Sequence, residues 1–279
     1  MLEIIKAILF GIIEGITEWL PVSSTGHMIL LEEFVKLDVS KEFWDLFLVV
    51  IQLGAILASV ILFWSKIWPF QMPDKEKNKS IFKKDTWMLL FKVGVACIPG
   101  VFFALFGIDD ICDKYFYNST GVSVALIVFG IVFILIEIWN KKRTPKLSDL
   151  GEMTFKLALM IGLFQLLAAA FPGTSRSGAT IIGALILGAS RTVASEFTFI
   201  LAIPAMLGAS LLELKDFLDA GISMGGLEIG ILLSGIFVAF AVSVVVIKFL
   251  MGYIKKHDFK VFGWYRIVLG LIVLLYFLF

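Results

Sequence analysis

The sequence predicts an all-α polytopic membrane protein, built as an inverted-topology repeat with three transmembrane helices and one re-entrant helix pair in each half. The first observation is composition: 59% of the 279 residues are hydrophobic and the mean hydropathy is +0.98, far above a soluble globular domain. The second is length, because several apolar runs approach the ~20 residues that cross a bilayer. The third is a matched pair of apolar regions, each interrupted by proline and a hydroxyl-rich loop.

The two interrupted regions are predicted to be re-entrant helix pairs. Proline lacks a backbone donor and clashes with the preceding turn, so the first helix of each pair should end near Pro21 or Pro172. Each half is too short to span, and irregular backbone at membrane depth is tolerated only inside protein or beside a wet cavity. The four halves are residues 4–20, 26–37, 157–171 and 178–189.

Six uninterrupted segments are predicted to span the membrane, in one membrane domain over residues 1–279. Repeat one covers about 1–140 and repeat two about 154–279. A constant offset of 151 residues places Pro21 over Pro172 and Ser24 over Ser175. The predicted spans are 43–64, 86–107, 120–140, 194–213, 228–250 and 262–279.

Lysine and arginine gather in the loops 66–85, 141–156 and 251–261, which the positive-inside rule places in the cytoplasm. The first re-entrant pair then opens outward and the second toward the cytoplasm, so the repeats are inverted. With a net charge of +1 and no basic stripe, nothing indicates nucleic acid. Glu137 is interpreted as an interface residue. The lysines of the first loop are Lys66, Lys75, Lys77, Lys79, Lys83 and Lys84.

Glu14 and Glu18 are four residues apart and therefore share a helix face. Two adjacent carboxylates repel each other unless one is protonated or a divalent metal lies between them. Burying them is costly on insertion scales, which favours a site in which charges neutralise one another. The alternative is a helix at the outer interface whose acids face water.

The loop after Pro21 brings hydroxyls, the N-terminus of a helix and an imidazole together. Ser24 is a candidate nucleophile and His27 a candidate catalytic group, while Ser23 and Thr25 are candidates for binding substrate. A helix N-terminus favours anions. The alternatives are that the hydroxyls only cap the helix and that His27 is a structural hydrogen-bond donor.

The partner loop carries Arg176 among small hydroxylated residues. A guanidinium fits phosphate bidentately and keeps its charge on burial. Its alternative role is a structural salt bridge to Glu14 or Glu18. Together the two loops indicate a phosphate or diphosphate site, and the carboxylates would repel such a substrate without a bridging Mg²⁺ or Ca²⁺. The substrate-binding candidates of this loop are Gly173, Thr174, Ser175, Ser177 and Thr180.

Three motifs carry a resemblance to a known family. They are E-G-I-T-E-W-L-P-V-S-S-T-G-H at 14–27, P-G-T-S-R-S-G-A-T at 172–180 and S-E-F-T-F-I-L-A-I-P at 195–204. The chain resembles the undecaprenyl-diphosphatase family, the bacitracin-resistance type of bacterial membrane phosphatase, over essentially its whole length.

The resemblance implies hydrolysis of undecaprenyl diphosphate to the monophosphate and inorganic phosphate, which recycles the lipid carrier of cell-wall synthesis. It also implies a homodimer in the bacterial cytoplasmic membrane, a divalent-metal-dependent site facing the extracytoplasmic side, and bacitracin as a competitor for the substrate. Carried over by motif, Glu14 and Glu18 bind metal or act as acid and base. Ser24 is the nucleophile, His27 assists it, and Arg176 holds the diphosphate. Whether serine or water attacks stays open.

Two other classes of membrane protein are alternatives to this phosphatase. Inverted repeats with broken helices are typical of secondary transporters, so a transporter or flippase of a lipid-linked phosphate is the main alternative. The unequal content of the two loops, with acids and histidine in one and arginine in the other, favours an enzyme. The lipid phosphatases with a histidine nucleophile need a second site histidine and an Arg-Pro element, which this sequence does not offer.

Overall fold

A computed structural model of the chain describes residues 1–72, 81–221 and 223–278, and Lys75, Lys77 and Lys79 of the first basic loop lie outside these. Six of its helices are long and apolar enough to cross a membrane, as predicted. The chain is therefore a multi-pass membrane protein. The six are α3 (Lys41–Leu62), α5 (Lys84–Leu105), α7 (Ser119–Asn140), α10 (Arg191–Asp219), α11 (Gly226–Tyr253) and α12 (Lys260–Leu278).

The main difference from the predicted spans is the end of α10, which continues to Asp219 instead of ending near residue 213. One side of the added turns packs inward, since Phe217 is buried in a cluster with Phe10, Phe43 and Phe47. Three short elements were not predicted. They are α4 (Trp64–Ile67), α6 (Ile108–Phe116) and the 3₁₀ helix η1 (Leu150–Glu152).

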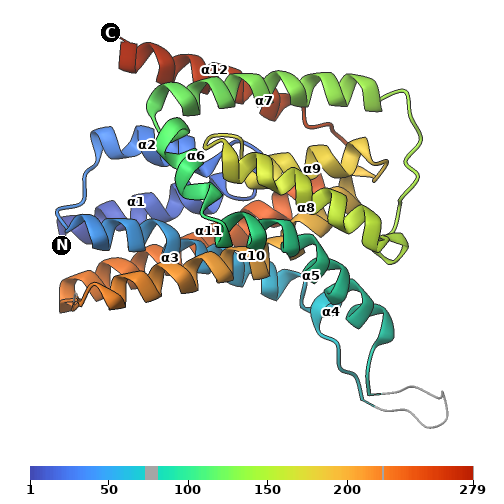
Figure 1. The fold of residues 1–279 in the computed structure, drawn as a ribbon, viewed down its shortest axis with the longest axis horizontal. Coiled ribbons are helices and arrows are strands. Elements are labelled where there is room, and N and C mark those ends of the chain that lie inside the picture. The colour runs from blue at the N-terminus through green and yellow to red at the C-terminus, as the bar shows by residue number, and fades with distance from the viewer. Residues whose placement is uncertain (73–80, 222, 279) are drawn as a thin grey trace.

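The two interrupted regions form helix–loop–helix pairs. The first helix of each pair ends before its proline, at Thr17 and at Ala170, as proline chemistry requires. In Figure 1 the first pair reaches the middle of the molecule from the left-hand end and the second pair from the right-hand end. The pairs are α1 (Leu2–Thr17) with α2 (Ser24–Phe34), and α8 (Phe155–Ala170) with α9 (Arg176–Ile186).

Close packing against α11 fixes the position of α1. These two helices and the pair α7 and α12 make the most extensive contacts in the described structure. A Cβ atom added at Gly15 would lie 2.7 Å from the Cβ of Val242 and 2.8 Å from the carbonyl oxygen of Ala239. Glycine is therefore required for this approach, which places Glu14 and Glu18 at a defined depth in the molecule.

The outward faces of the long helices are apolar. On α7, Val124, Val128, Ile131, Leu135 and Ile138 are all exposed, and their spacing places them on one side of the helix. A continuous apolar stripe of this length is unfavourable in water and indicates contact with lipid hydrocarbon.

An ion pair with a buried carboxylate joins the ends of three helices near the basic loops. Glu137 is 1% exposed, so its interpretation as an interface residue was wrong. Arg191 Nε donates to Glu137 Oε1 at 2.9 Å, and the backbone N–H of Phe259 donates to the same oxygen at 3.1 Å. The carboxylate is buried because a guanidinium and an amide satisfy it, which ties α7 to α10 and to the turn before α12.

Candidate functional site

The two polar loops meet at the carboxylate of Glu18, the residue that caps the C-terminal end of α1. Ser24 Oγ donates a hydrogen bond to Glu18 Oε2 at 2.8 Å, and Arg176 Nη2 donates to Glu18 Oε1 at 2.7 Å. Ser177 Oγ also donates to the Glu18 carbonyl oxygen at 3.2 Å. The loops predicted to share one site are therefore in direct contact, and Glu18 is the bridge between them.

The helices that follow the loops begin in the same way. Ser23 caps α2 and Ser175 caps α9, and their side chains accept from Gly26 N and Gly178 N at 3.3 and 3.2 Å. Both serines have positive φ, 73° and 71°, a conformation that costs a non-glycine residue about 1–3 kcal/mol. The strained cap directs the side chain of the next residue, Ser24 or Arg176, toward Glu18.

This geometry corrects the predicted register of the loops. Matching the prolines placed Ser24 over Ser175, whereas the structure gives Ser175 the same position as Ser23 and Arg176 the same position as Ser24. The cap and the glycine that donates to it determine where a helix begins, and Pro172 lies one residue farther from its cap than Pro21 does. Equivalent positions thus supply a hydroxyl and a guanidinium to opposite oxygens of one carboxylate.

Both ring nitrogens of His27 have partners. Nδ1 lies 2.7 Å from the carbonyl oxygen of Ser23 and Nε2 lies 2.7 Å from the hydroxyl of Tyr265, whose ring stacks on the imidazole. A carbonyl only accepts, so Nδ1 carries the proton, and in the neutral ring Nε2 accepts from Tyr265. The hydrogen bond of Ser24 goes to Glu18, so in this structure the carboxylate and not the imidazole is placed to take the serine proton.

Glu14 lies one turn before Glu18 on α1 and is 2% exposed. Its Oε1 has no hydrogen-bond partner in the described structure. A buried carboxylate with an unsatisfied oxygen is unfavourable unless a proton or a cation accompanies it. Among the described residues no three His, Cys, Asp or Glu side chains gather as a metal site. Mg²⁺ is often held by one or two carboxylates with phosphates completing its shell, so the pair fits a cation that binds with substrate.

The other predicted binding residues divide into two groups. Ser23, Ser175 and Thr180 serve the loop structure itself, since the Thr180 hydroxyl donates to the Arg176 carbonyl at 2.9 Å. Thr198 Oγ1 donates to Thr180 Oγ1 at 2.9 Å, which secures this arrangement from α10.

The hydroxyl of Thr174 is buried and has no hydrogen-bond partner in the described structure, while Thr25 is only half-buried. Ser177 lies against Ser175, with 3.1 Å between their Oγ atoms. Gly173 has φ of +95°, and its carbonyl oxygen accepts from Arg266. Thr25 is thus the hydroxyl of this set with the most freedom to bind a ligand, because Thr174 has no exposed surface.

Sequence reasoning missed Arg266. This residue of α12 is fully buried, and it donates from Nη1 to the Pro21 carbonyl at 3.3 Å and from Nη2 to the Gly173 carbonyl at 2.9 Å. The sequence does carry a sign of it, because an arginine within an apolar span is expensive and therefore a candidate for function.

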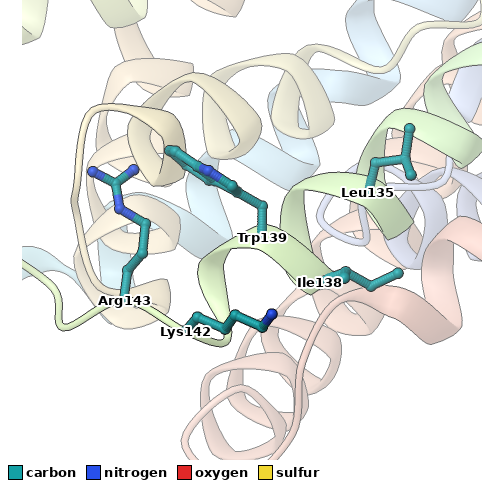
Figure 2. Close-up of a pocket in the computed structure, with 5 residues that line it drawn as sticks. All are labelled: Leu135, Ile138, Trp139, Lys142 and Arg143. Atoms are coloured by element: carbon teal, nitrogen blue, oxygen red, sulfur yellow. The ribbon is translucent and has the colours of Figure 1, made fainter.

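A separate hollow of about 670 Å³ lies at the C-terminal end of α7 and contains none of these residues (Figure 2). The guanidinium carbon of Arg143 lies 3.9 Å from the centre of the Trp139 ring. Tryptophan and arginine at the end of a span are typical anchors at the membrane surface. With Leu135, Ile138 and Lys142 as the remaining lining, the hollow lacks the carboxylates and hydroxyls of the loop site.

Comparison with known proteins connects the chain to a family. A family model described as "Bacitracin resistance protein BacA" matches residues 7–272. The undecaprenyl-diphosphatase of Desulfitobacterium hafniense is 58% identical over 277 residues, covering 99% of this chain and 97% of that protein. That of Enterococcus faecalis is 58% identical over 276 residues, with 98% and 97% covered. That of Lactiplantibacillus plantarum is 50% identical over 277 residues, with 99% and 98% covered.

Proposed function

Because the chain belongs to the bacitracin resistance protein BacA family, we propose that it hydrolyses undecaprenyl diphosphate to undecaprenyl phosphate and inorganic phosphate. Relatives named undecaprenyl-diphosphatase match it at 50–58% identity over nearly their full length. The structural observation that supports the proposal is the convergence of Ser24 and Arg176 on Glu18. The reaction recycles a lipid carrier for cell-wall synthesis.

The diphosphate group binds where the N-termini of α2 and α9 face each other across Glu18. The first N–H groups of a helix have no partner within the helix, and together with the helix dipole they favour an anion. Arg176 contributes a full positive charge and exchanges part of its contact with Glu18 for the non-bridging oxygens of the terminal phosphate. Thr25 supplies a further donor.

In the chemical step, Ser24 Oγ forms a bond to the terminal phosphorus while the bond from that phosphorus to the bridging oxygen breaks. Undecaprenyl phosphate leaves with the electron pair, and Glu18 Oε2 takes the serine proton across the existing hydrogen bond. Water then attacks the phosphoserine, and inorganic phosphate leaves as Ser24 recovers its proton. Phosphoryl transfer depends mainly on positioning and charge stabilisation, which Arg176 provides.

His27 assists the serine through the backbone. Its Nδ1–H donates to the carbonyl of Ser23, the residue directly before the nucleophile, and the Tyr265 hydroxyl bonds the other ring nitrogen, Nε2. The ring therefore holds the strained cap in the conformation that points Ser24 at Glu18.

A divalent cation, Mg²⁺ or Ca²⁺, is proposed to bind at Glu14 and Glu18 together with the substrate. It would neutralise the repulsion between the carboxylates and the diphosphate and polarise the phosphoryl oxygens. The unsatisfied Oε1 of Glu14 supports this assignment. Treatment with EDTA should abolish phosphate release, and excess Mg²⁺ or Ca²⁺ should restore it. Unchanged activity after complete chelation would show that the reaction does not need a metal.

The protein is proposed to lie in the bacterial cytoplasmic membrane as a homodimer with its site open to the extracytoplasmic side, where bacitracin competes for the same lipid. The basic loops support this orientation. In a variant whose native Cys97 and Cys112 are replaced by serine, a cysteine introduced at Lys36, in the loop after α2, should react in intact cells with an impermeant thiol reagent, whereas one at Lys256 should not. The reverse pattern would place the site inside.

The function is tested with purified protein in detergent, undecaprenyl diphosphate and a divalent cation. Phosphate should be released by the wild type, and Glu18→Ala, Ser24→Ala and Arg176→Ala should each abolish it, with thermal unfolding measured on each variant to show that the protein assayed is folded. An inactive wild type would refute the function, and active variants would refute the site.

A further inference from the structure

Arg266 is a buried cation with an unusual set of partners. Its side chain is fully buried, and no carboxylate of the described residues lies within 4.0 Å of it. Both terminal nitrogens donate instead to backbone carbonyls, Nη1 to Pro21 at 3.3 Å and Nη2 to Gly173 at 2.9 Å. Burying an unpaired charge costs several kcal/mol, so these two contacts are an expensive feature of the fold.

The two carbonyls occupy equivalent places. Pro21 lies two residues before the cap serine of α2, and Gly173 lies two residues before the cap serine of α9. One guanidinium therefore holds the same point of both loops. Its planar fork has a fixed spacing between the two terminal nitrogens, so it sets the distance between the loops in a way that a single ammonium group does not.

The neighbouring contacts of α12 reach the same two loops. Tyr265, the preceding residue, bonds Nε2 of His27 in the first loop. On the other side, a Cβ atom at Gly178 would lie 3.3 Å from Arg266 Nη1 and 3.1 Å from the ring of Phe133, so α9 begins directly against the guanidinium. Two consecutive residues of one span thus touch the parts of both loops that carry Ser24 and Arg176.

We propose that Arg266 is a positioning residue for the phosphatase reaction: it fixes the separation of the two loops so that Ser24 and Arg176 reach opposite oxygens of Glu18. It is not a catalytic residue, because it has no exposed surface and both of its terminal nitrogens are already engaged. This inference rests on the proposed function, since the geometry that Arg266 maintains is that of the proposed nucleophile and phosphate ligand.

The test compares Arg266→Lys and Arg266→Met with Arg191→Lys, a change at the partly buried ion pair to Glu137, which lies away from the loops. Displacing reacting groups by about 1 Å costs about 100-fold in rate. Both Arg266 variants should lower kcat by about 100-fold, with KM changing less than kcat. Arg191→Lys should lower the unfolding temperature but leave kcat per folded molecule unchanged.

A lysine keeps the charge but cannot reproduce the fork, so Arg266→Lys at wild-type kcat would overturn the inference. Hydrogen–deuterium exchange provides a second readout without substrate. Peptides over residues 20–27 and 172–178 should both exchange faster in the Arg266 variants and not in Arg191→Lys; unchanged protection in either loop also overturns it. An inactive wild type would refute the proposed function alone, because the exchange measurement still decides the role of Arg266.

Discussion

Replacing Glu18 with glutamine removes one charge from the site and leaves its shape almost unchanged. Glu18 accepts at both oxygens, from Arg176 at 2.7 Å and from Ser24 at 2.8 Å. Glutamine has one acceptor oxygen and one donor group. The oxygen will face Arg176, because two donors in contact repel, so the NH₂ will face Ser24 and the serine proton will lose its acceptor.

The expected loss follows from this geometry. A positioned general base contributes about 10²- to 10⁴-fold to rate, which corresponds to about 3–5 kcal/mol of activation free energy. We expect kcat of Glu18→Gln to fall by that factor. The unfolding temperature should change little, since a hydrogen bond to Arg176 is kept. Glu18→Asp is the matched variant, because it keeps the charge and shortens the reach.

The assay is phosphate release from undecaprenyl diphosphate under saturating substrate, with thermal unfolding measured on the same samples. A kcat of Glu18→Gln within tenfold of the wild type would refute the assignment of Glu18 as the proton acceptor. Equal kcat values for the glutamine and aspartate variants would show that shape and not charge matters at this position.

Three further outcomes follow from contacts at the two loops and between α1 and α11. With substrate labelled in the terminal phosphate and rapid acid quench, the wild type should carry label on the peptide containing Ser24 and Ser24→Ala should carry none; turnover by Ser24→Ala near the wild-type rate would assign the attack to water. Arg176→Lys should raise KM and lower kcat together, because an ammonium replaces a bidentate fork, and an unchanged KM would contradict its role in holding phosphate. Gly15→Ala should lower the free energy of unfolding by about 1–3 kcal/mol by forcing α1 away from Val242 and Ala239, and an unfolding temperature equal to that of the wild type would show that the contact relaxes freely.

The fold was largely predictable because hydrocarbon imposes length and polarity directly on the sequence. All six predicted spans are present, and the first helices of the interrupted pairs end before Pro21 and Pro172. The end of α10 was missed because Phe217 follows charged residues, and only its packing with Phe10 and Phe43 shows that these turns are helical and partly buried.

The contents of the site were predictable, but their contacts were not. Glu18, Ser24 and Arg176 stand out as polar groups in apolar surroundings. Which of them bond to one another depends on where the caps at Ser23 and Ser175 start their helices, and proline spacing gave that register one residue wrong. Arg266 stands out in the sequence only as a charge within an apolar span, and its role was overlooked because its partners are backbone carbonyls, which no acidic side chain in the sequence indicates.

Glu18 from one loop and Arg176 from the other are proposed to form a single phosphatase site. A double-mutant cycle on kcat/KM for undecaprenyl diphosphate, with Glu18→Gln, Arg176→Ala and the double variant, tests it most directly. When two residues act as one unit, substituting either one removes most of the activity of the enzyme. The kcat/KM of the double variant should therefore be no more than a few-fold below that of the less active single variant. Losses that multiply fully, or single variants that retain wild-type activity, would contradict it.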